Sequence, residues 1–151
     1  MILNPALAEE MFAHARSELP NEACGILAGK NGQVVKFLPA VNVAACPYPD
    51  DPSHRHTRTC GSPTRYVVDP QDQARFLAGV RKNDWDPDPL GIFHSHTHTP
   101  AYPSSTDVSL AVRNYPDAFY LIASLQNDPP LIRAFRVVEG QVAEEDISYP
   151  E

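Results

Sequence analysis

The chain has 151 residues, a formal net charge of −7 and a hydrophobic fraction of 42%. This length suits one domain, and the apolar fraction is sufficient for an ordinary core. The acidic balance argues against a nucleic-acid partner, which would need a basic face. No stretch reaches the roughly 18 apolar residues that span a bilayer, and no leader segment opens the chain, so we expect a cytoplasmic protein without a membrane partner. Three cysteines are too few for a disulfide framework.

The first forty residues predict a helix followed by a β-hairpin. The helix is expected from Asn4 to about Pro20, because an N-cap asparagine and a proline open an apolar stripe with helical spacing. His14 lies off that stripe, which predicts a solvated histidine. Ala23–Gly29 has the composition of a buried strand. The turn signal Asn31-Gly32 predicts that residues 33–38 pair antiparallel with that strand.

The rest of the chain alternates apolar runs with breaks rich in proline and glycine, which predicts strands and helices in turn. Together these elements predict an α/β (α+β) fold with a mixed central β-sheet, helices packed on its faces, and residues 1–151 in a single domain. The expected elements are strand Arg65–Val68, a helix opened by Asp69-Pro70, a connector at Asn83–Pro89, a buried strand that begins at Leu90, a helix over Asp107–Asn114, strand Ala118–Leu125, and a final hairpin of Leu131–Val138 with Gln141–Ile147.

Residues 43–64 form a long predicted loop rich in proline, histidine and cysteine. It contains Cys46, His54, His56 and Cys60, and two cysteines with two histidines can hold a structural zinc ion. The spacing lacks the usual C-x2-C pair. We therefore favour a proline-stiffened loop with reduced cysteines over a second zinc site.

The motif around which the chain is organised is a pair of histidines one residue apart. His94 and His96 follow the apolar run Leu90–Phe93, and side chains at i and i+2 of a strand point to the same face. Residues 97–103 predict a loop, and Asp107 follows in the first turn of a helix. Two imidazole nitrogens and one carboxylate oxygen can therefore converge. Three such ligands leave a fourth tetrahedral position open, as in catalytic zinc sites.

A catalytic zinc site also needs a proton shuttle and a hydrogen-bond donor for the oxyanion. Ser104, three residues before the aspartate, is the candidate donor. Glu22 is the candidate shuttle, because a carboxylate at the mouth of a buried strand can face a cleft. These two residues complete the candidate catalytic set.

Glu22 followed by His94-x-His96-x7-Ser104-x2-Asp107 resembles the signature of the JAMM (MPN-plus) zinc metalloproteases. The resemblance implies that the two histidines and Asp107 are zinc ligands. It also implies that Ser104 stabilises the tetrahedral intermediate. Glu22 would then activate the metal-bound water and pass its proton to the leaving amine.

The likeness extends from Glu10 to about Val138 and is closest to small, free-standing bacterial and archaeal members of that family. Those members are associated with ubiquitin-like sulfur-carrier proteins. The resemblance implies a zinc metallopeptidase or isopeptidase with the corresponding fold. Its substrate would be the amide bond after the Gly-Gly tail of a ubiquitin-like or sulfur-carrier protein, with cysteine or a conjugated amine released. Monomer and homodimer both stay open.

Other interpretations apply to the same residues. A non-catalytic binding or scaffold module of this fold would show a broken ligand set, whereas this set is intact. Taken singly, Asp107 is compatible with a helix-end charge and Ser104 with a capping residue. His98 continues the alternation, but the family pattern has no ligand there, so we expect it in the cleft wall. Cys24 is expected to be a buried small apolar residue, not a nucleophile.

Overall fold

The structure is a computed structural model that describes residues 1–45 and 60–150. Its described residues form ten elements: β1 Ile2–Leu3, α1 Pro5–Ser17, β2 Cys24–Lys30, β3 Gln33–Ala40, α2 Pro70–Asn83, β4 Asp86–His96, α3 Ser105–Asn114, β5 Phe119–Ser124, β6 Leu131–Val138 and β7 Gln141–Glu145. The strands make one mixed sheet in the order β1-β3-β2-β4-β5-β6-β7. The expected fold class is confirmed.

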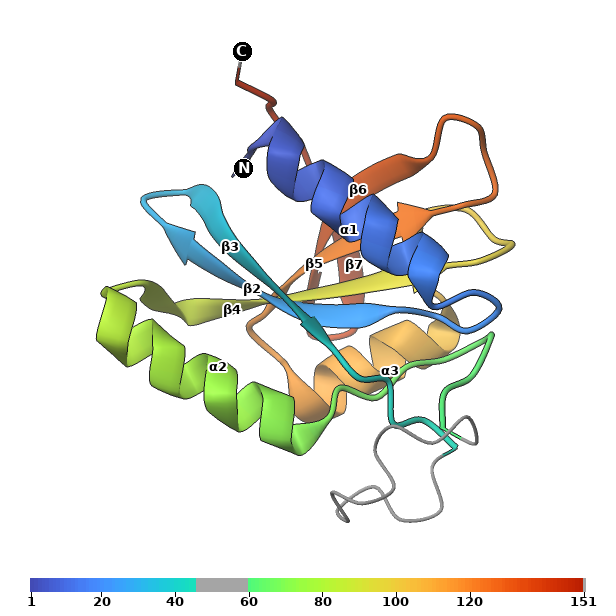
Figure 1. The fold of residues 1–151 in the computed structure, drawn as a ribbon, viewed down its shortest axis with the longest axis horizontal. Helices are drawn as coiled ribbons and strands as arrows, with labels where there is room; N and C mark the ends of the chain where they lie inside the picture. The colour runs from blue at the N-terminus through green and yellow to red at the C-terminus, as the bar shows by residue number, and fades with distance from the viewer. Residues whose placement is uncertain (46–59, 151) are drawn as a thin grey trace.

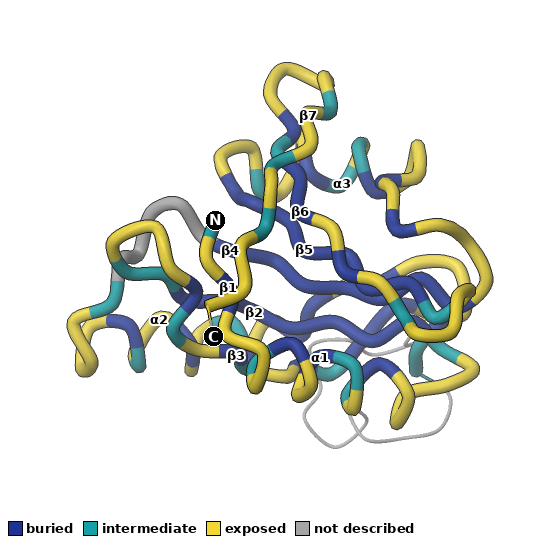
Figure 2. Tube along the Cα trace, turned by 90° about the horizontal axis from the view of Figure 1, so that it is seen from above, coloured by how far each residue is buried: buried dark blue, intermediate teal, exposed yellow. Residues whose placement is uncertain are grey.

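The helices lie on both faces of the sheet (Figure 1). Helix α1 packs on one face through its apolar stripe, and α2 and α3 pack on the other. Figure 2 shows the central strands buried and the outer turns exposed. The core therefore has two halves, separated by the sheet. Residues at the centre of the half under α2 and α3 are Cys24, Ile26, Phe76, Val80, Ile92, Ala111 and Ile122, and those under α1 are Ala8, Met11, Leu27, Phe93 and Leu121.

Strand pairing around β2 fixes the layout near the ends of the strands. The β2–β3 hairpin turns at Asn31 and Gly32, whose φ angles of 53° and 76° are those of a tight two-residue turn. Strand β4 pairs antiparallel with the other side of β2, with Cys24 opposite His94. Strand β5 then runs parallel to β4 after the crossover helix α3. The carboxyl end of β4 and the start of β2 therefore meet at one edge of the molecule.

Two expectations about the elements are wrong, and one strand was not expected. Strand β4 begins at Asp86, inside the predicted connector Asn83–Pro89. Proline is tolerated there because β5 pairs with β4 only from Gly91 onward and the pairing with β2 is irregular in this region. The predicted strand Arg65–Val68 is wrong, because its only ladder contact among the described residues is one isolated β-bridge at Val68. Strand β1 was not anticipated, because two residues are too few to show a period.

The predicted loop 43–64 lies mostly outside the described residues. Cys46, His54 and His56 fall there, so the second zinc site has no structural description. Cys60 is disulfide-bonded, which makes the expectation of reduced loop cysteines wrong for this residue. None of the helices in the described part of the chain is both long and apolar enough to cross a bilayer.

Close packing between β2, β4 and β5 generates a first prediction. A Cβ added at Gly91 would lie 2.3 Å from Cζ of Phe119 and 2.7 Å from Cβ of Leu27. We expect Gly91→Ala to lower the free energy of unfolding by about 1–3 kcal/mol. The control Gly79→Ala, in α2, has its nearest neighbour at 3.8 Å and should gain about 0.5–1 kcal/mol. Urea unfolding measures both, and equal stability of Gly91→Ala and the parent would contradict the packing.

Candidate metal centre

Two histidines project from the carboxyl end of β4 toward the α3 side of the sheet. They alternate with residues that face α1, so their rings lie on the same side as Ile92. His94 is 1% exposed and His96 is 4% exposed. Their Nε2 atoms lie 3.1 Å apart. The expected convergence of the two imidazoles is thus present in the structure.

The first turn of α3 brings a carboxylate to the same point. Asp107 Oδ2 lies 3.2 Å from Nε2 of His94 and 3.0 Å from Nε2 of His96. A capping box holds this turn, because the Ser104 N–H donates to Asp107 Oδ2 at 2.8 Å and the Asp107 N–H donates to Ser104 Oγ at 3.1 Å. The helix start therefore sets both the position and the orientation of the carboxylate.

Glu22 reaches the cluster from the segment that leads into β2. Because Cys24 pairs with His94, the residue two positions earlier is brought beside His96. Glu22 Oε1 lies 3.9 Å from Nε2 of His96. The side chain is 3% exposed, and its Oε2 has no hydrogen-bond partner among the residues that the structure describes. A buried, unpaired carboxylate oxygen beside three converging ligand atoms is typical of a site built for a further group.

The donor set fits a divalent metal ion. Two nitrogens and one oxygen, from His94, His96 and Asp107, lie 3.0–3.2 Å from one another. Ligands at about 2.0–2.1 Å from a tetrahedral zinc ion would be about 3.3 Å apart, so only a small adjustment is needed. Ligand atoms of Glu22 and the two histidines also lie within 4.8 Å of one another. The arrangement can hold one ion with a carboxylate beside its remaining position.

The two carboxylates of the cluster are held in opposite charge states. Burial raises the pKa of Glu22 to about 8, with His96 opposing and Asp107 adding to that rise. Burial also disfavours ionised Asp107, but the two histidines and the Ser104 N–H outweigh it and hold its pKa well below its usual range. Asp107 is therefore a fixed anion, whereas Glu22 binds a proton readily.

The pKa values of the two histidines are also shifted in opposite directions. Burial lowers the pKa of His94, despite the opposing effect of Asp107. Burial alone would also lower the pKa of His96, but its hydrogen bonds with Asp107 and with the Pro100 carbonyl outweigh burial and raise it. His94 is accordingly the neutral imidazole of the pair. A histidine binds a metal ion only as the neutral imidazole, so binding of an ion would displace any proton from His96.

The remaining candidates from the sequence have varied outcomes. Ser104 is exposed and serves as the N-cap of α3; its hydroxyl hydrogen stays available for donation. His98 is exposed beyond the end of β4, so the alternation stops at His96. Cys24 is fully buried with its pKa raised well above the usual value by burial, as expected for a non-nucleophile. The expectation for His14 is wrong, because this half-buried side chain hydrogen-bonds the Cys24 carbonyl at 2.9 Å.

Three residues that support the cluster were missed by sequence reasoning. Ser95 Oγ accepts a hydrogen bond from the Ala23 N–H at 2.8 Å, next to Glu22. Asn42 donates to the Glu22 carbonyl at 2.9 Å. Tyr66 stacks on His94, with ring centroids 4.3 Å apart. None of these contacts follows from a periodic pattern, so the sequence offered no signal for them.

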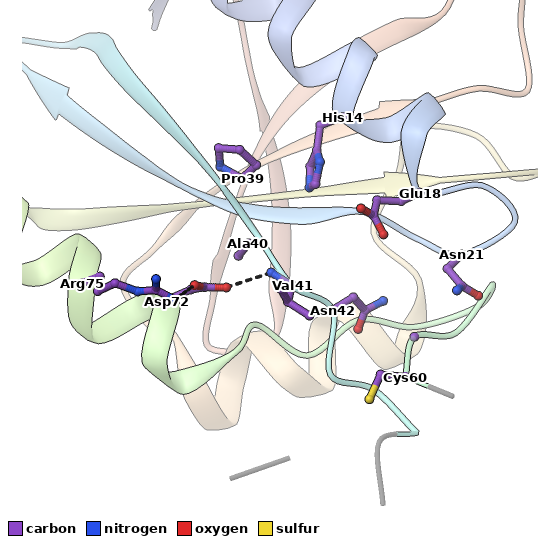
Figure 3. Close-up of a pocket in the computed structure, with 11 residues that line it drawn as sticks. His14, Glu18, Asn21, Pro39, Ala40, Val41, Asn42, Cys60, Asp72 and Arg75 are labelled. Atoms are coloured by element: carbon purple, nitrogen blue, oxygen red, sulfur yellow. Dashed lines mark hydrogen bonds and ion pairs between the residues drawn. The ribbon is translucent and has the colours of Figure 1, made fainter. Parts of the chain in front are cut away.

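A hollow of about 450 Å³ lies at the end of β3, between the last turn of α1 and the start of α2 (Figure 3). Its lining includes Asn21 and Asn42, but neither Asp107 nor the β4 histidines. In Figure 3 the dashed line joins the Val41 N–H to Asp72, a 2.9 Å hydrogen bond that holds the end of β3 against α2. The hollow is thus separate from the converging side chains of His94, His96 and Asp107.

The fold and this site define a class of protein. Residues 4–138 match the family described as prokaryotic homologs of the JAB domain. The chain therefore belongs to that family, which confirms the resemblance drawn from its sequence. The chain is also similar to relatives whose names state an activity. A CysO-cysteine peptidase of Mycobacterium tuberculosis is 37% identical over 156 residues, which cover 100% of this chain and 92% of the relative.

Two further likenesses extend this result. A probable TtuB-protein conjugate cleaving protease of Thermus thermophilus is 30% identical over 135 residues, covering 89% of this chain and 74% of the relative. The solution structure of protein DSY2949 from Desulfitobacterium hafniense superposes with a TM-score of 0.78 at 35% identity, covering 100% of this chain and 94% of that one. With relatives named as peptidase and protease along most of its length, the chain is a hydrolase.

The raised pKa of Glu22 generates a prediction for stability. The native state binds a proton at Glu22 up to about pH 8, whereas the ordinary pKa of a free glutamate is 4.5. The metal-free protein should therefore lose stability relative to Glu22→Gln as the pH rises from 4.5 to 8. Below that window the two should be equally stable. At its upper end we expect the variant to be more stable by about 1–3 kcal/mol, with solvent screening included.

Urea unfolding in the presence of a chelator, repeated across that pH window, measures the difference. Glu10→Gln is the matched control, because it removes the charge of an exposed glutamate. Its stability relative to the parent should change little with pH. A Glu22→Gln difference that is constant from pH 4.5 to pH 8 would contradict the burial argument.

Proposed function

We propose that the protein is a zinc-dependent peptidase or isopeptidase that cleaves the amide bond after the Gly-Gly tail of a ubiquitin-like or sulfur-carrier protein. The observation that carries the proposal is the position of Glu22, whose Oε1 lies 3.9 Å from His96 Nε2 beside three converging ligand atoms. A metal site alone is compatible with a structural role. A buried carboxylate of raised pKa next to that site supports proton transfer, and therefore catalysis.

In this proposal His94, His96 and Asp107 are the zinc ligands. A zinc ion bound there would supply a water molecule of lowered pKa and would polarise the scissile carbonyl. The carboxylate of Glu22 accepts the proton and passes it to the leaving nitrogen, which a pKa near neutrality suits. The hydroxyl of Ser104 donates a hydrogen bond to the developing oxyanion while its oxygen continues to cap α3.

The substrate class rests on the relatives and on the burial of the site. One relative is named a CysO-cysteine peptidase, and another is named a probable TtuB-protein conjugate cleaving protease. The proposed ligand residues are at most 5% exposed, and the exposed residues that contact them include Pro100 and Ser104. An extended tail that ends in glycines has no side chains to collide with such a buried centre. The leaving group is cysteine or a conjugated amine.

Cleavage of a tailed substrate gives the direct test. The purified chain is incubated with a ubiquitin-like carrier that bears a C-terminal Gly-Gly followed by a reporter amine, with and without a chelator. We expect cleavage after the second glycine, loss of cleavage with the chelator, and recovery when zinc is added back. Mass spectrometry of the products locates the cut.

The control variant for this experiment is Glu22→Gln. It leaves His94, His96 and Asp107 unchanged, so zinc binding should persist while turnover falls by about 10²–10⁴-fold. Retained turnover would show that another group is the base. The absence of cleavage by the parent protein under every metal condition would favour a non-catalytic binding module.

Ser104 has a dual role that two measurements can separate. Ser104→Ala removes the N-cap, which should lower the free energy of unfolding by about 1 kcal/mol. It also removes the oxyanion donor, which should lower turnover by about a hundredfold or more. Ser104→Thr retains a hydroxyl for both roles and should stay close to the parent. Unchanged turnover in a destabilised Ser104→Ala protein would mean that Ser104 acts only as a cap.

A further inference from the structure

The ring of Tyr66 lies flat against the ring of His94. Their centroids are 4.3 Å apart and the planes are inclined by 19°, whereas the two histidine rings meet at 56°. Tyr66 is 2% exposed and His94 is 1% exposed, so the stacked faces are removed from solvent. Tyr66 follows the long predicted loop and belongs to no helix or strand. The position of its ring on the imidazole is therefore not set by a regular element.

The two metal-ligand candidates are oriented by different means. Metal-binding histidines are usually oriented by a hydrogen bond from the second ring nitrogen. His96 follows this rule, because its Nδ1 lies 2.8 Å from the Pro100 carbonyl oxygen. The Nδ1 atom of His94 is buried without a hydrogen-bond partner in the described ranges 1–45 and 60–150. The orientation of this ring therefore depends on the groups packed against its faces.

We propose that Tyr66 is a positioning residue that holds the His94 imidazole in the orientation that binds the metal ion. The inference rests on the metal site of the proposed function and adds a residue to it. The stacked tyrosine ring restricts rotation of the imidazole away from its present plane. A hydrogen bond at Nδ1 would otherwise impose this restriction. An aliphatic side chain of similar bulk would fill the same space, but it has no flat face to hold the imidazole in one orientation.

Asn42 holds Tyr66 in place. Its amide group donates to the carbonyls of Glu22 at 2.9 Å and Arg65 at 3.1 Å. Its Oδ1 accepts from the N–H groups of Ala44 and Val67, both at 3.0 Å. All four hydrogen-bonding positions of this 6% exposed side chain are thus used. The residues on either side of Tyr66 are tied to one amide, and the same amide holds the backbone of Glu22.

The test compares Tyr66→Leu with Tyr66→Phe in the metal-loaded protein. Zinc affinity is measured by competition with a chromogenic chelator, and the ligand geometry by the visible absorption of the cobalt-substituted protein. We expect Tyr66→Leu to bind zinc about 10–100-fold more weakly and to show a changed cobalt spectrum. Tyr66→Phe keeps the stacked ring, so its zinc affinity should stay within about twofold of the parent.

Loss of core packing is separated from positioning by Phe76→Leu. Phe76 is 3% exposed and belongs to the same half of the core. This variant should lose stability but keep its zinc affinity and cobalt spectrum. Equal weakening of zinc binding by Phe76→Leu and Tyr66→Leu would overturn the inference, and so would parent-like affinity of Tyr66→Leu. If Tyr66→Leu is not folded, Tyr66→Met replaces it with the same expectations.

The role of Asn42 is tested by a double-mutant cycle on zinc affinity. If Asn42 acts through Tyr66, then Asn42→Ala and Tyr66→Leu should together weaken binding less than the product of their separate effects. Losses that simply multiply would remove Asn42 from the proposal. A parent protein that binds no metal and cleaves no substrate would instead overturn the proposed function, before any variant is compared.

Discussion

The antiparallel pairing of β2 with β4 is the constraint on which the candidate centre depends. Its register puts Cys24 opposite His94, and the chain just before β2 therefore runs beside His96. Two hydrogen bonds lock this junction, because Ala23 donates to Ser95 Oγ and accepts from the Ser95 N–H at 3.0 Å. A shift of one residue would turn the histidines to the α1 face and leave Glu22 without a cluster to join.

The same environment holds two carboxylates in opposite states because it offers them different partners. Asp107 accepts from a backbone N–H and lies within 3.2 Å of both imidazoles, and these contacts outweigh the cost of burial. Glu22 is as buried but has one oxygen without a partner and the other at 3.9 Å from His96. Asp107 is thereby fixed as an anion, whereas Glu22 remains able to exchange a proton.

Much of this centre was predictable because its residues sit on regular elements. The i, i+2 spacing of His94 and His96 fixes one face of a strand, and the Ser104–Asp107 spacing fixes the first turn of a helix. The hairpin and the helix caps were predicted for similar reasons. The prolines before Gly91 hid the first half of β4, because their missing N–H groups suggest a loop unless the local pairing is known.

The contacts that orient the centre were not predictable for a physical reason. Asn42 bonds to main-chain groups of four other residues, and any asparagine in a turn has the same local appearance. Tyr66 lies in an irregular segment, so no period indicates which way its ring points. The recognisable pattern therefore covers the converging residues of the candidate centre, whereas irregular segments outside the pattern fix the details of their geometry.

This division has a consequence for how the centre tolerates change. The proposed ligands on β4 and α3 are positioned by the hydrogen bonds of a strand ladder and a helix cap, which distribute the effect of a local change over many bonds. The His94 ring and the Glu22 backbone instead depend on the segment around Tyr66 and on a single buried amide. Loss of that amide would leave several buried N–H and carbonyl groups without a partner at once. Each such group costs free energy, so the segment would rearrange. The irregular segment, not the sheet, is the part of the fold where the geometry of the centre is most easily altered.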